Sequence, residues 1–172
     1  VTQIVTEPAV LDVTVAAVAN ETCSYSNNGS ISLTGSGGTG AYSFAITAPT
    51  ASASQASNTF SGLTGTTTGT SYTIQITDAN GCTDNVTQIV TEPAVLDVTV
   101  AAVANETCSY SNNGSISLNG SGGTGAYSFA ITAPTASASQ ASNTFSGLTG
   151  TTTGTSYTIQ ITDANGCTDN VT

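Results

Sequence analysis

The sequence predicts an all-β protein made of antiparallel β-sandwich domains, and three observations lead to that prediction. Short segments alternate apolar and polar side chains with a period of two residues, as half-buried strands do. Clusters of turn-forming residues, such as NNGS, GSGGTG and DANG, separate these segments. No segment shows helical periodicity, because Thr, Ser and Val dominate where a helix would favour Leu, Glu and Lys. Short strands at this spacing are typical of an antiparallel sandwich.

Four segments in the first half of the chain carry the alternation most clearly. They are residues 10–15 (VLDVTV), 30–35 (SISLTG), 41–47 (AYSFAIT) and 71–77 (SYTIQIT). In each segment the large apolar side chains share one face and the polar side chains share the other. Tyr72 stands near the start of its strand, where the tyrosine corner of sandwich folds occurs, so we expect a structural role for it.

The second half of the chain repeats the first with a period of 85 residues. Shifting the sequence by that period superimposes Cys23 on Cys108 and leaves one difference, Thr34 against Asn119. This difference falls on the polar face of a predicted strand, where a polar exchange costs little. A repeat of this length is the signature of a tandem array in which each unit is one small domain.

The run TDANGCTDNVTQIVTEP predicts where one domain ends and the next begins. DANG predicts a tight turn, the residues after it predict a last strand, and the proline ends that strand because it cannot donate to the ladder. We therefore expect residues 1–8 to be the closing strand and hinge of a preceding repeat. Residues 9–93 are expected to form one complete domain, and residues 94–172 a second domain that lacks most of its last strand. The joint is short and contains proline, which predicts a stiff connection.

The charge balance excludes several classes of function. The chain has ten Asp and Glu residues and no Lys, Arg or His, which gives a formal net charge of −10. Proteins bind nucleic acids and anionic lipids through basic residues, so neither partner is expected. No stretch approaches the roughly 20 apolar residues of a membrane span. Without His, Lys or Arg there is no Ser-His pair or Ser-Lys dyad, and we expect the protein not to be an enzyme.

Cysteine occurs twice in each repeat, at Cys23, Cys82, Cys108 and Cys167. A zinc site would need all four thiolates from both repeats, and lone buried cysteines in an intracellular protein are a further alternative. Disulfides in an exported protein are favoured, because small β domains gain stability from a covalent tie. Three pairings are possible. The pairs Cys23–Cys82 and Cys108–Cys167 are favoured, since a repeated unit should be complete in itself.

Several motifs resemble the SprB repeat of Bacteroidota cell-surface proteins. They are CSYSNNGSISL, GGTGAYSF, SGL, GTSYTIQITDANGC and the closing VTEP. The chain departs from the family pattern in the longer link TGTTTGTSY and in APTASASQASN, which replaces a short aromatic segment. The resemblance implies tandem Ig-like antiparallel β-sandwich domains of about seven strands each, joined end to end. It also implies a large cell-surface adhesin that is exported by the type 9 secretion system and serves gliding motility or attachment.

Calcium is the one cofactor that the sequence suggests. Carboxylates and backbone carbonyls are its ligands, and the segment TDANGCTDN offers Asp78 and Asp84. Glu92 at the joint and Glu106 of the second repeat are candidates for a further calcium site. The spacing matches no EF-hand loop. In the alternative interpretation, Asp78 and Asn80 form an Asx turn that needs no metal.

The expected function is that of a structural repeat in a long extracellular adhesin or filament, where it serves as a stiff spacer. Its partners would be the neighbouring repeats of the same chain. In one alternative each repeat binds a glycan or a surface and acts by avidity, with Tyr25 and Tyr42 as the candidate contact residues. In another, several chains pack laterally into a thicker filament through the Ala- and Ser-rich segment 48–58.

Overall fold

A computed structural model describes residues 1–172, and it is all-β. The chain divides into two compact units, Val1–Glu92 and Pro93–Thr172. The boundary lies one residue before the predicted one. Residues 1–10 form no strand and are exposed. No helix of the protein is long and apolar enough to cross a membrane.

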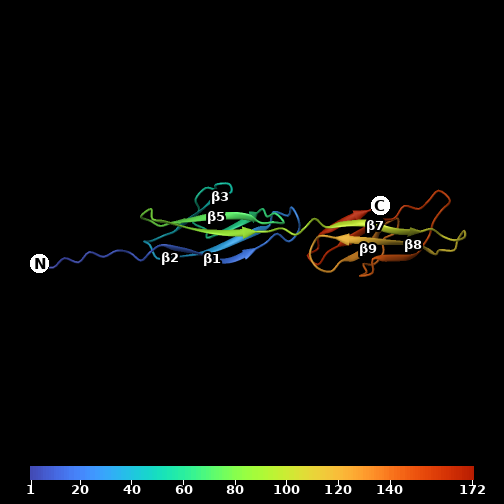
Figure 1. The fold of residues 1–172 in the computed structure, drawn as a ribbon, viewed down its shortest axis with the longest axis horizontal. Coiled ribbons are helices and arrows are strands. Elements are labelled where there is room, and N and C mark those ends of the chain that lie inside the picture. Colours follow the sequence, from blue (N-terminus) through green and yellow to red (C-terminus); the bar gives the residue numbers. More distant parts are fainter. The chain divides into compact units, whose positions relative to one another are not determined.

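The first unit contains six antiparallel strands in two sheets (Figure 1). Their bounds are β1 Asp12–Ala19, β2 Gly29–Ser36, β3 Ser43–Ala48, β4 Thr59–Leu63, β5 Thr70–Thr77 and β6 Thr83–Val90. One sheet has the order β1-β2-β4 and the other the order β3-β5-β6. This is the ABE and CFG arrangement of an immunoglobulin-like sandwich without strand D. The predicted fold class is therefore confirmed.

Each unit has six strands where about seven were expected, and the difference falls in the segment between β3 and β4. Residues 49–58 make one isolated bridge, in which Gln55 and Phe44 exchange two backbone hydrogen bonds of 2.8 and 2.9 Å. The segment is rich in Ala and Ser and has no large apolar side chain. It therefore has nothing to bury against the sandwich, and a seventh strand does not form.

The core of the first unit lies between its two sheets. Its fully buried side chains, none more than 2% exposed, are Ile31, Leu33, Ile74, Ile76 and Val90. Tyr72 is also buried, and its hydroxyl donates a hydrogen bond of 2.9 Å to the backbone carbonyl of Thr64. This confirms the tyrosine corner that the sequence predicts. Thr34 and Asn119 are both exposed, as the polar face requires.

The second unit has the same six strands and the same two sheets, but five of its strands differ from their equivalents in length or burial. Its strands are β7 Asp97–Ala104, β8 Gly114–Ser121, β9 Ser128–Ala133, β10 Thr144–Leu148, β11 Thr158–Thr162 and β12 Thr168–Val171. In the first unit the start of β5 pairs with the end of β6, through Thr70 with Val90 and Ser71 with Ile89. The chain reaches Thr172 before the equivalent partners, so β11 starts later than β5.

Candidate functional site

One end of the first unit holds the closing strand in place, and we call it the seat. The seat is formed by the β1–β2 loop (residues 20–28) and the β4–β5 loop (residues 64–69). The end of β6 and residues 91–92 lie against both loops. The N–H of Glu21 donates to the carbonyl of Thr91 at 2.9 Å, and the N–H of Glu92 donates to the carbonyl of Thr66 at 3.1 Å. Backbone bonds therefore tie the last strand to two loops far away in sequence.

Close steric contact also defines the seat. A Cβ atom on Gly65 would lie 2.4 Å from the carbonyl carbon of Thr91, and one on Gly29 would lie 2.6 Å from Cγ1 of Val90. Real Cβ atoms do not approach other atoms so closely, so both positions need glycine. Val90 itself is fully buried. Burial of a valine side chain contributes about 1.5 to 3 kcal/mol to stability.

The carboxylate of Glu21 lies at the centre of the seat and is only 5% exposed. It accepts hydrogen bonds from the backbone N–H of Asn27 at 2.7 Å and from the hydroxyl of Ser26 at 3.2 Å. Its other oxygen accepts a short hydrogen bond from the N–H of Gly65. A buried carboxylate needs such donors, because an unpaired buried charge is strongly unfavourable. Glu21 therefore joins the two loops of the seat.

The carboxylate of Glu92 completes the connection from the other side. It accepts hydrogen bonds from the backbone N–H of Tyr25 at 2.8 Å and from the hydroxyl of Ser24 at 3.3 Å. Tyr25 has a positive φ of 60°, and so has Asn27 at 51°. Residues other than glycine seldom adopt this conformation, and it persists where surrounding contacts enforce it. Here Glu92 accepts a hydrogen bond from the N–H of Tyr25, and Glu21 accepts one from the N–H of Asn27.

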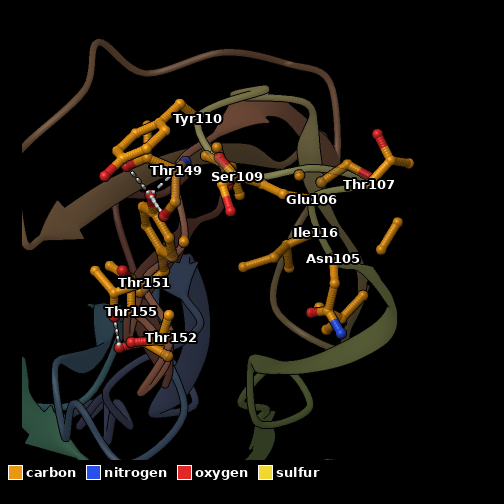
Figure 2. A pocket seen from close by; sticks show the side chains of 18 of the residues that line it. Asn105, Glu106, Thr107, Ser109, Tyr110, Ile116, Thr149, Thr151, Thr152 and Thr155 are labelled. Atoms are coloured by element: carbon orange, nitrogen blue, oxygen red, sulfur yellow. Dashed lines mark hydrogen bonds between the residues drawn. The ribbon is translucent and has the colours of Figure 1, made fainter.

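The second unit shows the same seat without the end of its closing strand, because β12 stops at Val171. A pocket of about 1050 Å³ lies there, lined by residues that include Glu106, Tyr110, Ile116, Thr149 and Tyr157. In Figure 2, Thr149, Thr151 and Thr152 lie on one side of this pocket, and Asn105, Glu106 and Ile116 lie on the other. These residues are the equivalents of the first unit's seat, where residues 89–92 occupy the space. The pocket is therefore the unfilled position of a closing strand rather than a preformed cavity for a small ligand.

Equivalent residues of identical type have different burial and different contacts in the two seats. Ile31 is fully buried, whereas its equivalent Ile116 is half-buried. Glu106 keeps one of the three donors that Glu21 has, namely the N–H of Asn112 at 3.0 Å. A Cβ atom on Gly150 would have its nearest neighbour, an oxygen of Glu106, at 4.0 Å. The strand therefore accounts for the burial and the tight packing of the seat.

The opposite end of each unit is built around a buried aspartate. Asp78 is 6% exposed, and its oxygens accept backbone hydrogen bonds from Thr39, Asn80 and Cys82 at 2.8 to 2.9 Å. Burial raises the pKa of the Asp78 carboxyl, but the three N–H donors together outweigh it and hold this pKa below its ordinary value. The same bonds recur at Asp163. This geometry is the predicted Asx turn, extended to the neighbouring loop.

The four predicted calcium ligands do not form a cluster within the units. Asp78 binds backbone N–H groups at one end of the first unit, and Glu92 does so at the other. Asp84 lies on β6 and accepts a hydrogen bond of 2.9 Å from the N–H of Val13, which connects the edges of the two sheets. Glu106 lines the pocket of the second unit. No group of three His, Cys, Asp or Glu residues has the geometry to hold a metal ion. Calcium binding stays a prediction.

The two tyrosines proposed as contact residues lie at opposite ends of the unit. Tyr25 is in the seat and 74% exposed. Tyr42 is half-buried, and its hydroxyl donates to the carbonyl of Gly37 at 2.6 Å. Its ring covers Gly35, where a Cβ atom would lie 3.0 Å from the ring. The two side chains thus form no shared surface, and Tyr42 has a structural role.

The predicted disulfide pairs Cys23–Cys82 and Cys108–Cys167 are wrong. Cys82 and Cys108 are exposed free thiols, whereas Cys23 and Cys167 are disulfide-bonded. The reason is the direction of β6. Cys82 comes just before this extended strand and the Cys23 loop packs where it ends, so the two cysteines lie at opposite ends of the unit. A disulfide in an exported protein is still supported.

Sequence patterns do not single out Glu21, although it holds the seat together. The available signal is weak. Glu21 is one of five carboxylates per repeat, and it precedes a turn rather than lying on a strand. Nothing in the local sequence shows that Gly65, far along the chain, will be its partner.

Fold and site together define a class of protein. It is a tandem array of small immunoglobulin-like sandwiches whose charged groups bond their own backbone. The model of the SprB repeat family matches residues 15–51 and, one period later, residues 100–136. Each match begins in the first strand of a unit and ends after its third strand. The two matched segments are therefore similar to the SprB repeat, which supports the resemblance predicted from the motifs.

Two further comparisons add little. No curated protein matches the chain. A solved structure described as three N-terminal domains of the bacteriophage RB49 Highly Immunogenic Outer Capsid protein (Hoc) is 12% identical, with a TM-score of 0.47. The match covers 92% of this chain and 58% of that one, so the chain spans less than two thirds of the phage structure. A likeness of this size carries no argument about function.

Proposed function

We propose that each repeat is a structural link in a long extracellular adhesin of a bacterial cell surface, where it acts as a stiff, non-enzymatic spacer. The observation that carries this proposal is the use of the carboxylates. Glu21, Glu92, Asp78 and Asp84 all bond backbone N–H groups of their own unit. The side chains that could perform chemistry therefore maintain the fold. The two matches to the SprB repeat model support the same function.

Near-identity of the repeats is the second support. A spacer needs length and mechanical stability, whereas a set of recognition modules gains from variation at the contact surface. The two repeats differ at one exposed strand position, Thr34 against Asn119. Export fits the disulfide, because such bonds persist in oxidising compartments. The proposal includes export by the type 9 system and a role in attachment or gliding.

Proteins of two, four and eight repeats provide the test. Small-angle X-ray scattering should give a maximum dimension that grows in proportion to the number of repeats. A flexible string of domains would instead grow with about the square root of that number. Square-root growth would contradict the spacer function, because such an array could not hold a distant tip away from the cell.

A second candidate is direct binding of a glycan or a surface. One observation favours it, namely the exposed rings of Tyr25 and Tyr110, which are 74% and 93% exposed. Glycan-array binding by the two-repeat chain, lost in the double variant Tyr25→Ala/Tyr110→Ala, would support this candidate. The control is Tyr42→Phe, which keeps a ring that lies elsewhere in the unit. Signals that are equal for the native chain and the double variant would exclude the tyrosines as contacts.

A further inference from the structure

The turn between β5 and β6 carries the dipeptide Asn80–Gly81 at its tip. Both residues are exposed, and a Cβ atom on Gly81 would meet no other atom within 4 Å. The backbone N–H of Asn80 donates to Oδ1 of Asp78 at 2.9 Å, but the side-chain amide of Asn80 has no hydrogen-bond partner. The amide and the backbone nitrogen that follows it therefore lie on an open part of the surface.

The same dipeptide occurs a second time in the unit, as Asn28–Gly29 where β2 begins, and there it is held in place. Oδ1 of Asn28 accepts hydrogen bonds from the N–H of Thr22 at 3.1 Å and from the hydroxyl of Ser26 at 2.8 Å. Its Nδ2 donates to Oγ1 of Thr22 at 2.8 Å. Gly29 is buried, and a Cβ atom on it would lie 2.6 Å from Cγ1 of Val90. One unit thus contains an open and a locked copy of the same dipeptide.

We propose that Asn80 is a site of spontaneous deamidation, where the side-chain amide is converted to a carboxylate and part of the product is isoaspartate. Glycine favours this reaction, because it places no side chain beside the attacking backbone nitrogen. At Asn28 the same reaction is suppressed, because three hydrogen bonds hold the amide and the following glycine is buried. The modification is independent of the spacer function.

The reaction needs only water. The backbone nitrogen of Gly81 attacks Cγ of Asn80, a bond between them forms, and the side-chain nitrogen leaves as ammonia with the proton of the attacking N–H. Water then opens the resulting succinimide ring at one of its two carbonyl carbons. Opening at Cγ gives aspartate with a normal backbone. Opening at the backbone carbonyl gives isoaspartate, whose backbone runs through Cγ.

Hydrogen bonds that must break set the difference between the two dipeptides. The attacking N–H of Gly81 donates to the carbonyl of Asp78 at 3.1 Å, the longest hydrogen bond of this turn, and the ring cannot form until it breaks. At Asn28 three bonds of the side chain must break before its amide can turn toward the next nitrogen. Two additional bonds correspond to a rate lower by roughly 5- to 150-fold.

Both products would change the turn around Asp78. Aspartate adds a negative charge two residues from this buried carboxylate, and like charges repel. Isoaspartate adds one backbone carbon between the N–H groups of residue 80 and Cys82, which both donate to Oδ1 of Asp78. The longer backbone cannot keep both bonds in their present geometry. Deamidation should therefore weaken the β5–β6 hairpin as the protein ages.

Mass spectrometry of the whole chain, aged at neutral pH, tests the proposal. The variant Asn165→Gln is used, because residues 78–83 and 163–168 are otherwise identical peptides. After reduction, a protease that cleaves before aspartate releases residues 78–83, which report Asn80, and residues 12–77, in which fragmentation locates Asn28. Isoaspartate leaves each peptide uncut and heavier, whereas newly formed aspartate adds a cleavage before residue 80 or residue 28. The same chain is aged in urea for comparison.

In the folded chain, conversion at Asn80 should be faster than at Asn28 by roughly 5- to 150-fold. In urea the two rates should become similar, because neither dipeptide is held. Asn80→Gln is the control and should stop conversion at this position, since glutamine would have to form a larger ring. A ratio in the folded chain no greater than the ratio in urea would overturn the proposal. So would a folded chain that keeps Asn80 intact while the unfolded chain converts it.

Discussion

The carboxylate of Glu92 accepts a 2.8 Å hydrogen bond from the backbone N–H of Tyr25, a residue held at a φ of 60°. This bond joins the last residue of the first unit to a loop at its beginning. Together with the bonds of Glu21, it closes the sandwich after β6. The closing strand is therefore a structural component of the repeat.

Replacement of Gly65 by alanine should destabilise the first unit, because the new Cβ would meet the backbone of residue 91. The expected loss is about 1 to 3 kcal/mol in the free energy of unfolding, typical of forced overpacking. Gly150→Ala is the matched control, since the same position is open in the second unit. Urea denaturation measures both. Equal effects of the two substitutions would show that the strand does not occupy the seat.

Glu21→Ala should cost about 3 kcal/mol in the free energy of unfolding. It removes three hydrogen bonds to a buried carboxylate and takes this acceptor away from the part-buried N–H groups of Gly65 and Asn27. Glu106→Ala, in the open seat, should cost about 1 kcal/mol, because one such bond is lost. Thermal and urea unfolding test the difference. A larger effect at Glu106 than at Glu21 would contradict the role assigned to the closed seat.

A synthetic peptide with the sequence of residues 87–93, TQIVTEP, should bind the pocket of the second unit. The same residues fill the seat of the first unit, so their backbone and the valine side chain match it. A chain without residues 1–8 is used, because that segment has the same sequence and would compete. Calorimetry should show saturable binding that Gly150→Ala abolishes and that a scrambled peptide does not reproduce. Binding that survives Gly150→Ala would place the peptide elsewhere.

Stability should fall in acid as Asp78 becomes protonated. Three backbone donors hold its folded-state pKa below the ordinary value of 3.8, despite its burial. Its contribution is therefore complete above about pH 4 and is lost as the pH falls through the lowered pKa. Urea midpoints between pH 2 and pH 7 should show a less steep acid limb for Asp78→Asn than for the native chain. Asp12→Asn, at an exposed strand position, is the control and should keep the native slope.

The fold could be predicted from the sequence because its signals are local. Alternation over 30–35 and 71–77 placed Leu33 and Ile74 in the core, and the Tyr72 corner depends on its position at a strand start. The repeat itself showed which position tolerates a polar exchange. The absence of a seventh strand was not predicted. The segment before Thr59 is long enough for a strand, but the side chains of residues 49–58 cannot stabilise one.

The seat and the disulfides could not be predicted because both depend on distances through space. Glu21 and Gly65 are far apart in sequence, and neither lies in a recognisable motif. The assumption that a repeat is covalently complete led to the pairing of Cys23 with Cys82. In the structure, β6 runs from Cys82 toward the Cys23 loop and so places the two cysteines at opposite ends of the unit. The sequence does not show that the Cys23 loop packs against the end of β6.

Force spectroscopy of an eight-repeat protein tests most directly the claim that the repeats are links that resist mechanical force. In the presence of a reductant, each repeat should unfold in a separate step and lengthen the chain by roughly 250 Å, its extended length less its folded length. Smooth extension at low force without steps in the reduced protein would contradict the claim that each closed sandwich resists load.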